Sequence, residues 1–366
     1  MTVKTAIGLM SGTSMDGIDA AILTSDGHRI ETLGPALTLP YDSGFRARLR
    51  GVMGAPEGAD IAGVARALTE RHAEAVARLL SETGMAAAEI DVVGFHGQTI
   101  LHQPAQGQPG KGRTLQIGDG ALLAGLTGIP VVNDFRTSDV AAGGEGAPFA
   151  PAYHAALTAH LGRPVAMLNL GGVGNVTWIG GETDLLAFDT GPGNALIDDW
   201  VHRHTGAACD EDGRLAAQGK VDRVRIDTVL EGPYFQRRPP KSLDRDDFSA
   251  TLAEGLSLED GAATLAALTV ACVAKAADWF PQPPLRWIVT GGGRRNPVIM
   301  EGLRAALDVP VQATEELGWD GDALEAHAFA YLAVRSLAGL PLSFPGTTGV
   351  PHPLPGGVLH QPRIGP

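Results

Sequence analysis

Apolar residues near the start of the chain form two short runs separated by a turn of glycine and small polar residues. Residues 6–19 read AIGLMSGTSMDGID, and residues 166–177 repeat the plan as AMLNLGGVGNVT. Short apolar runs joined by a glycine-rich turn are typical of two strands paired in a hairpin. We therefore predict a strand–turn–strand unit in each half of the chain.

Helical and strand patterns alternate through the rest of the first half. Apolar residues recur at helical spacing over 60–81, and a second helix is predicted over 121–127. Residues 91–97 read DVVGFHG, which predicts a buried strand ending in a glycine turn, and 129–135 predict another strand. Residues 140–146 are rich in glycine and alanine without periodicity, so we expect a hinge and a domain boundary there.

The second half follows the same plan. An apolar run leads into DTGPGN at 189–194, and helices are predicted over 195–202 and 322–334. A late strand at 287–290 ends in the three glycines 291–293, which mirrors the strand and glycine turn of the first half. This order predicts an α/β fold with a mixed sheet in each lobe. We expect lobes at 1–140 and 141–366, with the C-terminal segment packing back on the first lobe.

Composition narrows the class of protein. The 366 residues are enough for two domains, at roughly 150 residues each. A net charge of -13 argues against nucleic-acid and membrane-surface partners. Cys209 and Cys272 are far apart and are expected to be reduced. The chain opens on a strand, not an apolar leader, and we find no run near the ~18 apolar residues of a membrane span. A cytoplasmic protein is therefore expected.

The glycine turns suit an anionic ligand. Glycine lets the backbone take positive φ and approach a ligand closely, and successive N–H groups form an anion-binding concavity. Ser11 and Ser14 add hydroxyl donors, while Asp16 and Asp19 have oxygens that could orient Mg²⁺ through water. An ordinary hairpin explains one copy equally well. Two copies in matching positions favour a pair of turns that grip the phosphates of a nucleotide.

Together these segments resemble the landmarks of the sugar kinase, heat-shock chaperone and actin superfamily of ATPases. More narrowly, the chain is similar to the anhydro-N-acetylmuramic acid kinase family over nearly its whole length. The motifs that carry this are GLMSGTSMDG at 8–17, GFHGQT at 94–99, DFR at 134–136, GGEGAP at 143–148 and FDTGPGN at 188–194. Glu145 stands where that family often has Gln, and Asp119 where Asn also occurs.

The resemblance implies a two-lobed, actin-like ATPase fold with its active site in the cleft, and ATP and Mg²⁺ as cofactors. The implied reaction uses ATP to phosphorylate the 6-oxygen of 1,6-anhydro-N-acetylmuramic acid while water opens the anhydro bridge. Its product, N-acetylmuramic acid 6-phosphate, belongs to peptidoglycan recycling. The expected ATP and phosphate contacts are Gly12, Thr13, Ser14, Met15, Asp16, Gly17, Ile18, Asp19, Gly171, Gly172, Gly174, Asn175, Gly291, Gly292, Gly293 and Asn296.

Asp189 is the expected catalytic base for the water, because it follows an apolar strand and precedes a glycine turn. The alternative is a helix N-cap, although Asn194 lies nearer that helix. Arg136 is expected to bind the lactyl carboxylate of the sugar, because a guanidinium can donate two parallel hydrogen bonds to a carboxylate. The alternative is an ion pair between Arg136 and Asp134 or Asp139. The expected substrate contacts are His96, Gln98, Asp119, Arg136, Glu145, Gly191, Asn194 and Glu325. The alternative for Glu325 is an exposed glutamate on the predicted helix.

Other interpretations remain open at this stage. A kinase of another sugar or small acid, an ATP-switched binding module and a nucleotide-independent hydrolase use some of the same motifs. His202, His204 and Cys209 do not match the spacing of a structural zinc site, so no directly bound metal is expected. Residues 239–242 form a loop that either closes over substrate or is a surface turn. The expected partner is a small amino sugar, and the sequence leaves a homodimer open.

Overall fold

The computed structural model describes residues 2–12, 14–104, 108–243 and 247–362. The chain divides into two compact units, one of Met1–Ala159 with Ala323–Pro366 and one of His160–Asp322. The boundary therefore falls after 159 and not after 140, and residues 140–146, the expected hinge, lie inside the first unit. The reason is that α5 (Ala150–Leu157) packs on α11 (Leu324–Leu337), with the rings of Tyr153 and Tyr331 6.0 Å apart.

The first unit is built on a mixed sheet whose strands run in the order β12-β6-β4-β1-β2-β3, with β5 on the far part of β4. Strands β1, β2 and β3 are antiparallel neighbours, whereas β1, β4 and β6 are parallel. Its elements are β1 (Lys4–Ser11), β2 (Gly17–Ser25), β3 (Ile30–Pro40), α1 (Ser43–Val52), α2 (Ile61–Thr83), β4 (Val92–Gln103), β5 (Arg113–Ile117), α3 (Gly120–Thr127), β6 (Val131–Asn133), α4 (Thr137–Ala141), α5, α11, α12 (Pro345–Thr348) and β12 (Val358–His360).

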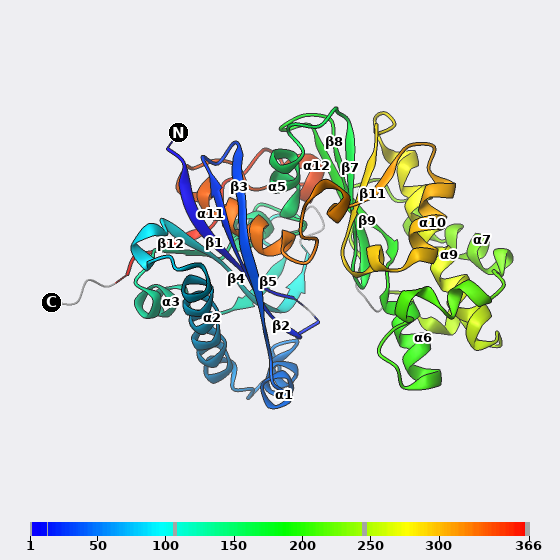
Figure 1. Ribbon diagram of the computed structural model, residues 1–366, viewed down its shortest axis with the longest axis horizontal. Helices are drawn as coiled ribbons and strands as arrows, with labels where there is room; N and C mark the ends of the chain where they lie inside the picture. The colour runs from blue at the N-terminus through cyan, green and yellow to red at the C-terminus, as the bar shows by residue number, and fades with distance from the viewer. Residues whose placement is uncertain (1, 13, 105–107, 244–246, 363–366) are drawn as a thin grey trace. The chain divides into compact units, whose positions relative to one another are not determined.

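Helices cover both faces of this sheet (Figure 1). On one face, Ile7 and Leu9 of β1 join the apolar core beneath α2. On the other face, Gly8 and Gly94 lie side by side in β1 and β4. A Cβ atom on either glycine would lie within 2.0 Å of a backbone oxygen of α11. Helix α11 therefore rests directly on the strand backbones, which only glycine permits at these two positions.

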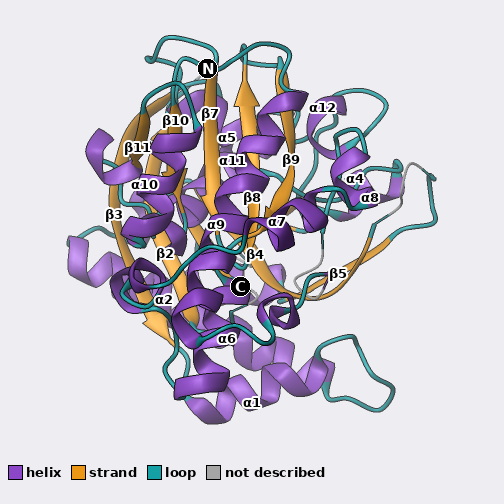
Figure 2. Ribbon diagram, turned by 90° about the vertical axis from the view of Figure 1, so that its right-hand side faces the viewer, coloured by secondary structure: helices purple, strands orange, loops and turns teal. Residues whose placement is uncertain are grey.

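The second unit is built on a sheet in the order β11-β10-β7-β8-β9, which Figure 2 shows with α9 and α10 in front of the strands. Strands β7, β10 and β11 are parallel, and β7, β8 and β9 are antiparallel. Its elements are β7 (Val165–Leu170), β8 (Val173–Ile179), β9 (Leu185–Pro192), α6 (Ala195–Thr205), α7 (Arg223–Leu230), α8 (Pro233–Gln236), α9 (Leu258–Ala276), β10 (Trp287–Thr290), α10 (Pro297–Ala306) and β11 (Val311–Ala313).

The segment Leu258–Trp279, α9 and the short turn after it, is long and apolar enough to span a membrane by length and composition alone, with a mean hydropathy of 1.3. The expectation that no segment approaches that length is therefore wrong. Within the unit, 61% of an 18-residue window of this segment is buried, and its apolar residues pack with Trp200 and Phe188 in the main core. Burial in this core accounts for the apolar character of the segment.

The predicted elements correspond closely to those observed, and the mixed α/β class is confirmed. Helix α2 begins after Asp60, whose side chain accepts the Gly63 N–H in an N-cap. The strand predicted over 91–97 does not end at its glycine. Instead β4 passes through Gly97 at φ 72° and continues to Gln103, paired with β5. A glycine inside an apolar run therefore marks an irregularity in this strand and not its end.

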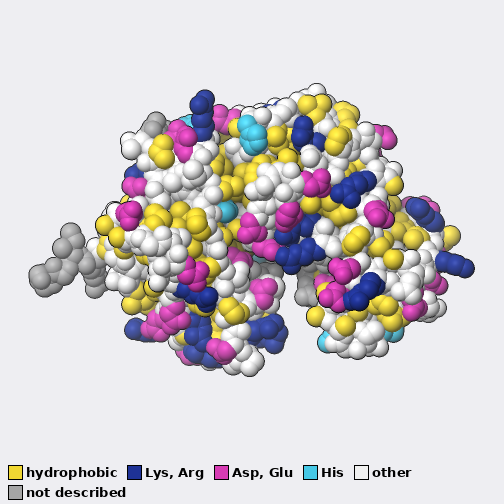
Figure 3. All heavy atoms as spheres, viewed as in Figure 1, with side chains coloured by type: hydrophobic (Ala, Val, Ile, Leu, Met, Phe, Trp, Pro, Cys, Tyr) yellow, Lys and Arg dark blue, Asp and Glu magenta, His cyan; other side chains and the backbone are white. Residues whose placement is uncertain are grey.

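Acidic and basic side chains are interspersed on the face that Figure 3 shows. On α2, Arg66 pairs with Glu70 at 2.9 Å and Arg78 with Glu82 at 2.7 Å, both one helical turn apart. Exposed pairs of this kind each stabilise a protein by less than about 1 kcal/mol. The stability of the first unit therefore depends mainly on its buried core.

Three buried histidines make the first unit sensitive to acid. Burial lowers the pKa of His72 and of His154 to about 4, and that of His96 well below 6.5. The unfolded chain binds these protons near pH 6.5, so unfolding takes up protons at any pH between these values. We expect the free energy of unfolding to fall as pH drops below 6.5. Each histidine contributes up to about 1.4 kcal/mol per pH unit, and the loss is complete below its folded-state pKa.

Urea unfolding followed by circular dichroism from about pH 7 to about pH 4.5 measures this slope. His72→Leu should flatten it by up to about 1.4 kcal/mol per pH unit. His352→Ala, at an exposed position, is the control and should leave the slope unchanged. An unaltered slope in His72→Leu would contradict the assignment of a neutral His72.

Candidate functional site

The first glycine turn joins β1 to β2 and is held at both ends. Gly12 O accepts the Met15 N–H at 3.1 Å and the Gln98 side-chain amide at 3.2 Å, and Asp16 O accepts the Tyr41 N–H at 2.9 Å. Met15 has φ 53°, which closes the turn. Thr13, an expected phosphate contact, lies outside the described residues.

Gln98 supports this turn from beneath. Its side chain is fully buried, and its amide oxygen accepts the Ser11 hydroxyl at 2.7 Å. Ser11 lies 2.9 Å from the Tyr41 hydroxyl as well. Gln98 was expected to contact substrate, but both ends of its amide are engaged inside the protein. The structure therefore places Gln98 where it positions the turn.

Gly17, Ile18 and Asp19 belong to β2 and not to the turn. Gly17 and Ile18 pair with β3, and the Ile18 side chain is in the core. Asp19 accepts the Thr38 hydroxyl at 2.5 Å, and Asp16 accepts the Ser14 hydroxyl at 2.8 Å. Three of the expected phosphate contacts of this hairpin thus lie on a strand and not in the turn.

Glu325 lies in the first turn of α11, near Asp16 and Asp19. The side chain keeps exposed surface, but the surrounding protein desolvates it and raises its pKa. Repulsion from Asp19 and, more weakly, Asp16 raises that pKa further, whereas Arg136 lowers it. Glu325 is thus an exposed helical residue, as the alternative had it, whose pKa is nevertheless raised. Carboxylates with raised pKa values cluster at functional sites.

Arg136 and His96 form a second polar pair in the first unit. The guanidinium donates from Nε and Nη2 to His96 Nε2 at 3.2 and 3.0 Å, and from Nη1 to Gly146 O at 2.6 Å. His96 Nδ1 faces Gly97 O at 2.8 Å, so the ring carries its hydrogen on Nδ1. Burial, helped by Arg136, lowers the pKa of His96, and burial lowers that of Arg136 to about 10. A neutral imidazole thus orients the guanidinium.

The loop at 143–148 is fixed by Asp139 and α12. Asp139 is buried and accepts the Gly146 N–H at 2.8 Å and the Thr348 hydroxyl at 2.6 Å. The Glu145 N–H donates to Thr348 O at 2.7 Å. Asp139 therefore holds the loop that receives Arg136, and the alternative of an Arg136–Asp139 ion pair does not describe this geometry. Thr348, the last residue of the short helix α12, thus contacts this loop through its carbonyl and Asp139 through its hydroxyl.

Asp119 has a local role in the structure. Its side chain accepts the Leu122 N–H at 2.9 Å as the N-cap of α3, and its own N–H donates to Thr69. A capping aspartate stabilises a helix by about 0.5–2 kcal/mol. This capping contact accounts for an aspartate at position 119 without any contact to a substrate.

The second glycine turn joins β7 to β8 and meets the turn after β9. Gly171 O accepts the Asn194 N–H at 2.7 Å, and Gly172 O accepts the Gly193 N–H at 3.0 Å. The Asn194 side chain donates to Leu170 O at 3.2 Å. Asn194 precedes α6 but makes no side-chain cap, so its amide joins two loops.

The third turn, at 291–293, lies against the same strand ends. A Cβ atom on Gly291 would lie 2.4 Å from Asn169 Oδ1, and one on Gly293 2.6 Å from Leu170 Cβ. Gly292 is less restricted, at 3.2 Å from the Asn194 amide nitrogen. Asn296 caps α10 by accepting the Val298 N–H at 3.0 Å. These contacts bring the turns after β7, β9 and β10 together at one edge of the sheet.

Three of the expected phosphate glycines, Gly12, Gly171 and Gly172, differ from the others because they have room beside them. A Cβ atom on Gly171 would lie 3.7 Å from its nearest neighbour, Val173 O. A Cβ atom on Gly12 would lie 3.5 Å from the Ser14 hydroxyl, and one on Gly172 3.6 Å from Ala195. By contrast, a Cβ on Gly174 would lie 2.6 Å from the Thr190 hydroxyl and one on Gly191 2.7 Å from Cys272. Protein packing explains Gly174 and Gly191. It does not explain Gly12, Gly171 and Gly172, where a ligand close to the backbone would.

Asp189 lies on β9, directly opposite Asn175 of β8. Its carboxylate accepts the Leu243 N–H at 2.8 Å, its own N–H donates to Lys241 O at 3.0 Å, and its carbonyl accepts the Tyr234 hydroxyl. Asp189 precedes α6 by several residues and does not cap it, so the N-cap alternative is excluded. Its carboxylate is oriented by a loop that is distant in sequence.

Sequence reasoning did not assign a role to the residues that hold Asp189. Tyr234, Lys241 and Leu243 come from the segment at 234–243, of which only 239–242 were noted, as a loop. A lysine in the run PPKS gives no sign of burial, and only the structure shows that Lys241 is buried.

The fold and these turns define the class of protein: a two-unit α/β protein with a glycine-tipped hairpin in each sheet. A sequence model described as anhydro-N-acetylmuramic acid kinase matches residues 4–361. The chain belongs to the anhydro-N-acetylmuramic acid kinase family.

Two relatives with the same family name agree with this assignment. The anhydro-N-acetylmuramic acid kinase of Rhodospirillum rubrum is 59% identical over 356 residues, covering 96% of this chain and 93% of the relative. That of Paramagnetospirillum magneticum is 57% identical over 360 residues, covering 98% and 99%. A solved xylulose kinase from Lactobacillus acidophilus is 10% identical with a TM-score of 0.47, covering 98% of this chain and 94% of the other.

Proposed function

We propose that this chain is an ATP-dependent kinase that converts 1,6-anhydro-N-acetylmuramic acid and water to N-acetylmuramic acid 6-phosphate. Family membership supports the substrate class. The mechanism rests on the position of the Asp189 carboxylate. It accepts the Leu243 N–H, and Asp189 lies on β9, which pairs with the strand that follows the second glycine turn. The same proposal puts the enzyme in the cytoplasm, in peptidoglycan recycling.

Asp189 acts as the general base in this proposal. It takes a proton from water, and the water oxygen bonds to the anomeric carbon of the sugar. The bond from that carbon to the bridging 6-oxygen breaks, and the 6-oxygen bonds to the γ-phosphorus of ATP as ADP leaves. A base within hydrogen-bond reach of the water contributes about 10²–10⁴-fold in rate.

The glycine turns supply the phosphate contacts. Backbone N–H groups at 12–16 and 171–172 receive the phosphates, and the room beside Gly12 and Gly172 supports close approach. Phosphoryl transfer depends mainly on positioning and charge neutralisation. The turn at 291–293 is proposed to contact adenosine.

Mg²⁺ fits the acidic residues of the first unit. No three His, Cys, Asp or Glu side chains among the described residues are grouped to hold a metal directly. Asp16 and Asp19 are close enough to raise the pKa of Glu325, and Mg²⁺ prefers oxygen ligands while keeping several waters. We propose that Asp16 and Asp19 hold the ion through water. The bound ion would neutralise charge on the phosphates.

Arg136 and Glu325 are the proposed sugar contacts. After its bonds to His96 and Gly146, each terminal nitrogen of Arg136 keeps a second N–H. Those groups suit the lactyl carboxylate, since a guanidinium binds a carboxylate bidentately. The Glu325 carboxylate is proposed to accept a sugar hydroxyl.

Incubation with ATP and Mg²⁺ tests the proposal. We expect ADP and the ring-opened 6-phosphate from 1,6-anhydro-N-acetylmuramic acid, both identified by mass spectrometry. Glucose and acetate are the comparison substrates and should give no phosphorylated product. Phosphorylation of either, with no turnover of the anhydro sugar, would contradict the substrate and leave the fold assignment intact.

A further inference from the structure

Lys241 is buried, with 4% of its surface exposed, although lysine rarely is. Its ammonium donates to Tyr234 O at 3.1 Å and lies 4.4 Å from the centre of the Tyr234 ring. The rings of Trp279 and Phe188 are 5.5 and 5.7 Å away. Within the described residues no carboxylate pairs with it, so cation–π attraction takes the place of an ion pair.

The charge of Lys241 is held in an unusual environment. Burial, with smaller contributions from Arg237 and Lys275 and against an opposing one from Cys272, lowers the pKa of Lys241 from 10.5 to about 8. Even so, the lysine is mainly protonated near neutral pH. The three rings therefore enclose a cation and not a neutral amine.

The backbone around Lys241 meets Asp189 on both sides. Lys241 O accepts the Asp189 N–H at 3.0 Å, and two residues later the Leu243 N–H donates to the Asp189 carboxylate at 2.8 Å. Tyr234 supplies both a ring to the ammonium and a hydroxyl to Asp189 O. Tyr234, which contacts the ammonium through both its ring and its carbonyl, thus belongs to the same segment that orients the carboxylate.

We propose that Lys241 is a positioning residue for Asp189. Its ammonium, held by the rings of Tyr234 and Trp279, pins the segment 234–243 so that the Leu243 N–H orients the Asp189 carboxylate. The effect on turnover rests on the proposed function, in which Asp189 is the base. The effect on the segment itself does not. A displacement of about 1 Å in a catalytic group can cost about 10²-fold in rate.

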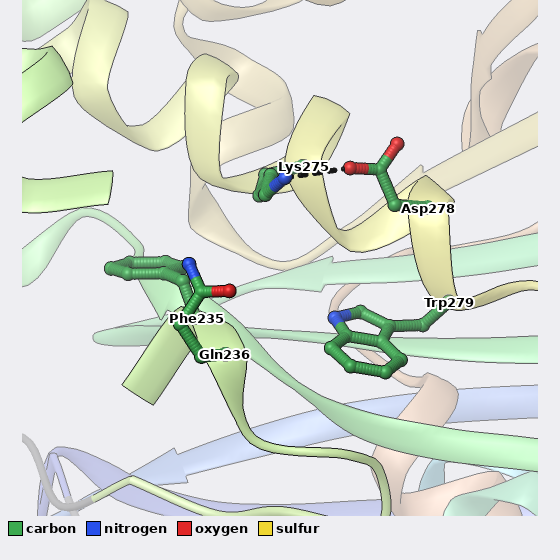
Figure 4. Close-up of a pocket in the computed structure, with 5 residues that line it drawn as sticks. All are labelled: Phe235, Gln236, Lys275, Asp278 and Trp279. Atoms are coloured by element: carbon green, nitrogen blue, oxygen red, sulfur yellow. Dashed lines mark hydrogen bonds and ion pairs between the residues drawn. The ribbon is translucent and has the colours of Figure 1, made fainter. Parts of the chain in front are cut away.

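The neighbouring cavity supplies a second variant and a control. It measures about 120 Å³ and is lined by Phe235, Gln236, Lys275, Asp278 and Trp279. Figure 4 shows Lys275 and Asp278 pointing toward one another, joined by an ion pair of 2.8 Å. Trp279 borders this cavity and is partly buried against the main core, so Trp279→Leu opens the aromatic enclosure while the leucine keeps part of the core contact. Lys275→Met removes a nearby lysine that makes no described contact with Asp189.

Lys241→Met keeps the length of the side chain and removes its charge. We expect kcat to fall about 10–100-fold, while the KM for the sugar and the Kd for ATP change less than about threefold. Hydrogen exchange should accelerate at the Leu243 and Asp189 amides and stay unchanged elsewhere in the second unit. Trp279→Leu should change kcat and the exchange rates of the two amides in the same direction, but by a smaller factor. Lys275→Met should leave kcat and both exchange rates within about twofold of the parent.

The two readouts separate this inference from the proposed function. If the parent protein turns over no anhydro sugar but Lys241→Met still exposes the two amides, the proposed function fails and the positioning of Asp189 stands. Unchanged exchange at both amides together with the parent kcat would overturn the inference. So would an equal effect in Lys275→Met, or loss of protection throughout the unit. If Lys241→Met does not fold, Trp279→Leu decides by the same criteria.

Discussion

Asp189→Asn is expected to be folded, to bind ATP and sugar, and to be nearly inert. The amide keeps the shape of the side chain, and its oxygen can still accept the Leu243 N–H, but it cannot take a proton from water. Loss of a general base costs about 10²–10⁴-fold in rate. Because bridge opening and phosphorylation are proposed to be concerted, formation of ADP should stop with formation of the sugar phosphate. A coupled ADP assay measures the rate, and calorimetry measures the two affinities.

Asp184→Asn is the matched control, because Asp184 is exposed and precedes the opposite end of β9. It should keep the parent rate. A near-parental rate of ADP and product formation in Asp189→Asn would remove Asp189 from catalysis. Glu325, whose pKa is raised, would then be the first alternative base, since Asp119 caps α3.

Gly172→Val is expected to weaken ATP binding about 10–100-fold. The fold has room for a Cβ there, so the variant should fold, but the side chain would occupy the space over the turn where phosphate oxygens meet backbone N–H groups. A hydrogen bond to a charged group is worth about 1.5–3 kcal/mol, and each 1.4 kcal/mol is about tenfold in affinity. Gly12→Val should act in the same way from the first unit. Calorimetry with ATP and Mg²⁺ measures both.

Gly181→Val is the control for this experiment. Gly181 follows β8 at the other end of the same strand pair, and its nearest neighbour, Asp184 Cβ, would lie 3.5 Å from an added Cβ. ATP affinity should not change. If Gly12→Val and Gly172→Val both fold and bind ATP with parental affinity, the two turns do not bind the phosphates.

Residues that act within a few positions of one another were predictable from the sequence. The late strand was predicted over 287–290, which are the bounds of β10, and the helix predicted over 60–81 is α2, displaced by a residue or two. The apolar run before Asp189 was predicted as a strand and is part of β9, although β9 continues past Asp189 to Pro192. Apolar periodicity and glycine at tight turns act locally, so a linear pattern contains them.

Contacts between distant segments decided the rest. From the sequence, Gln98 was expected to contact substrate. In the structure its amide oxygen accepts the hydroxyl of Ser11, which lies 87 positions away in the sequence. The Leu243 N–H that orients Asp189 is 54 positions away, and Thr348 reaches Asp139 across 209. The sequence by itself determined the strands, the turns and the family. Only the tertiary structure decided which polar groups are already hydrogen-bonded inside the protein. Burial and hydrogen bonding depend on segments that are distant in the sequence and close together in space.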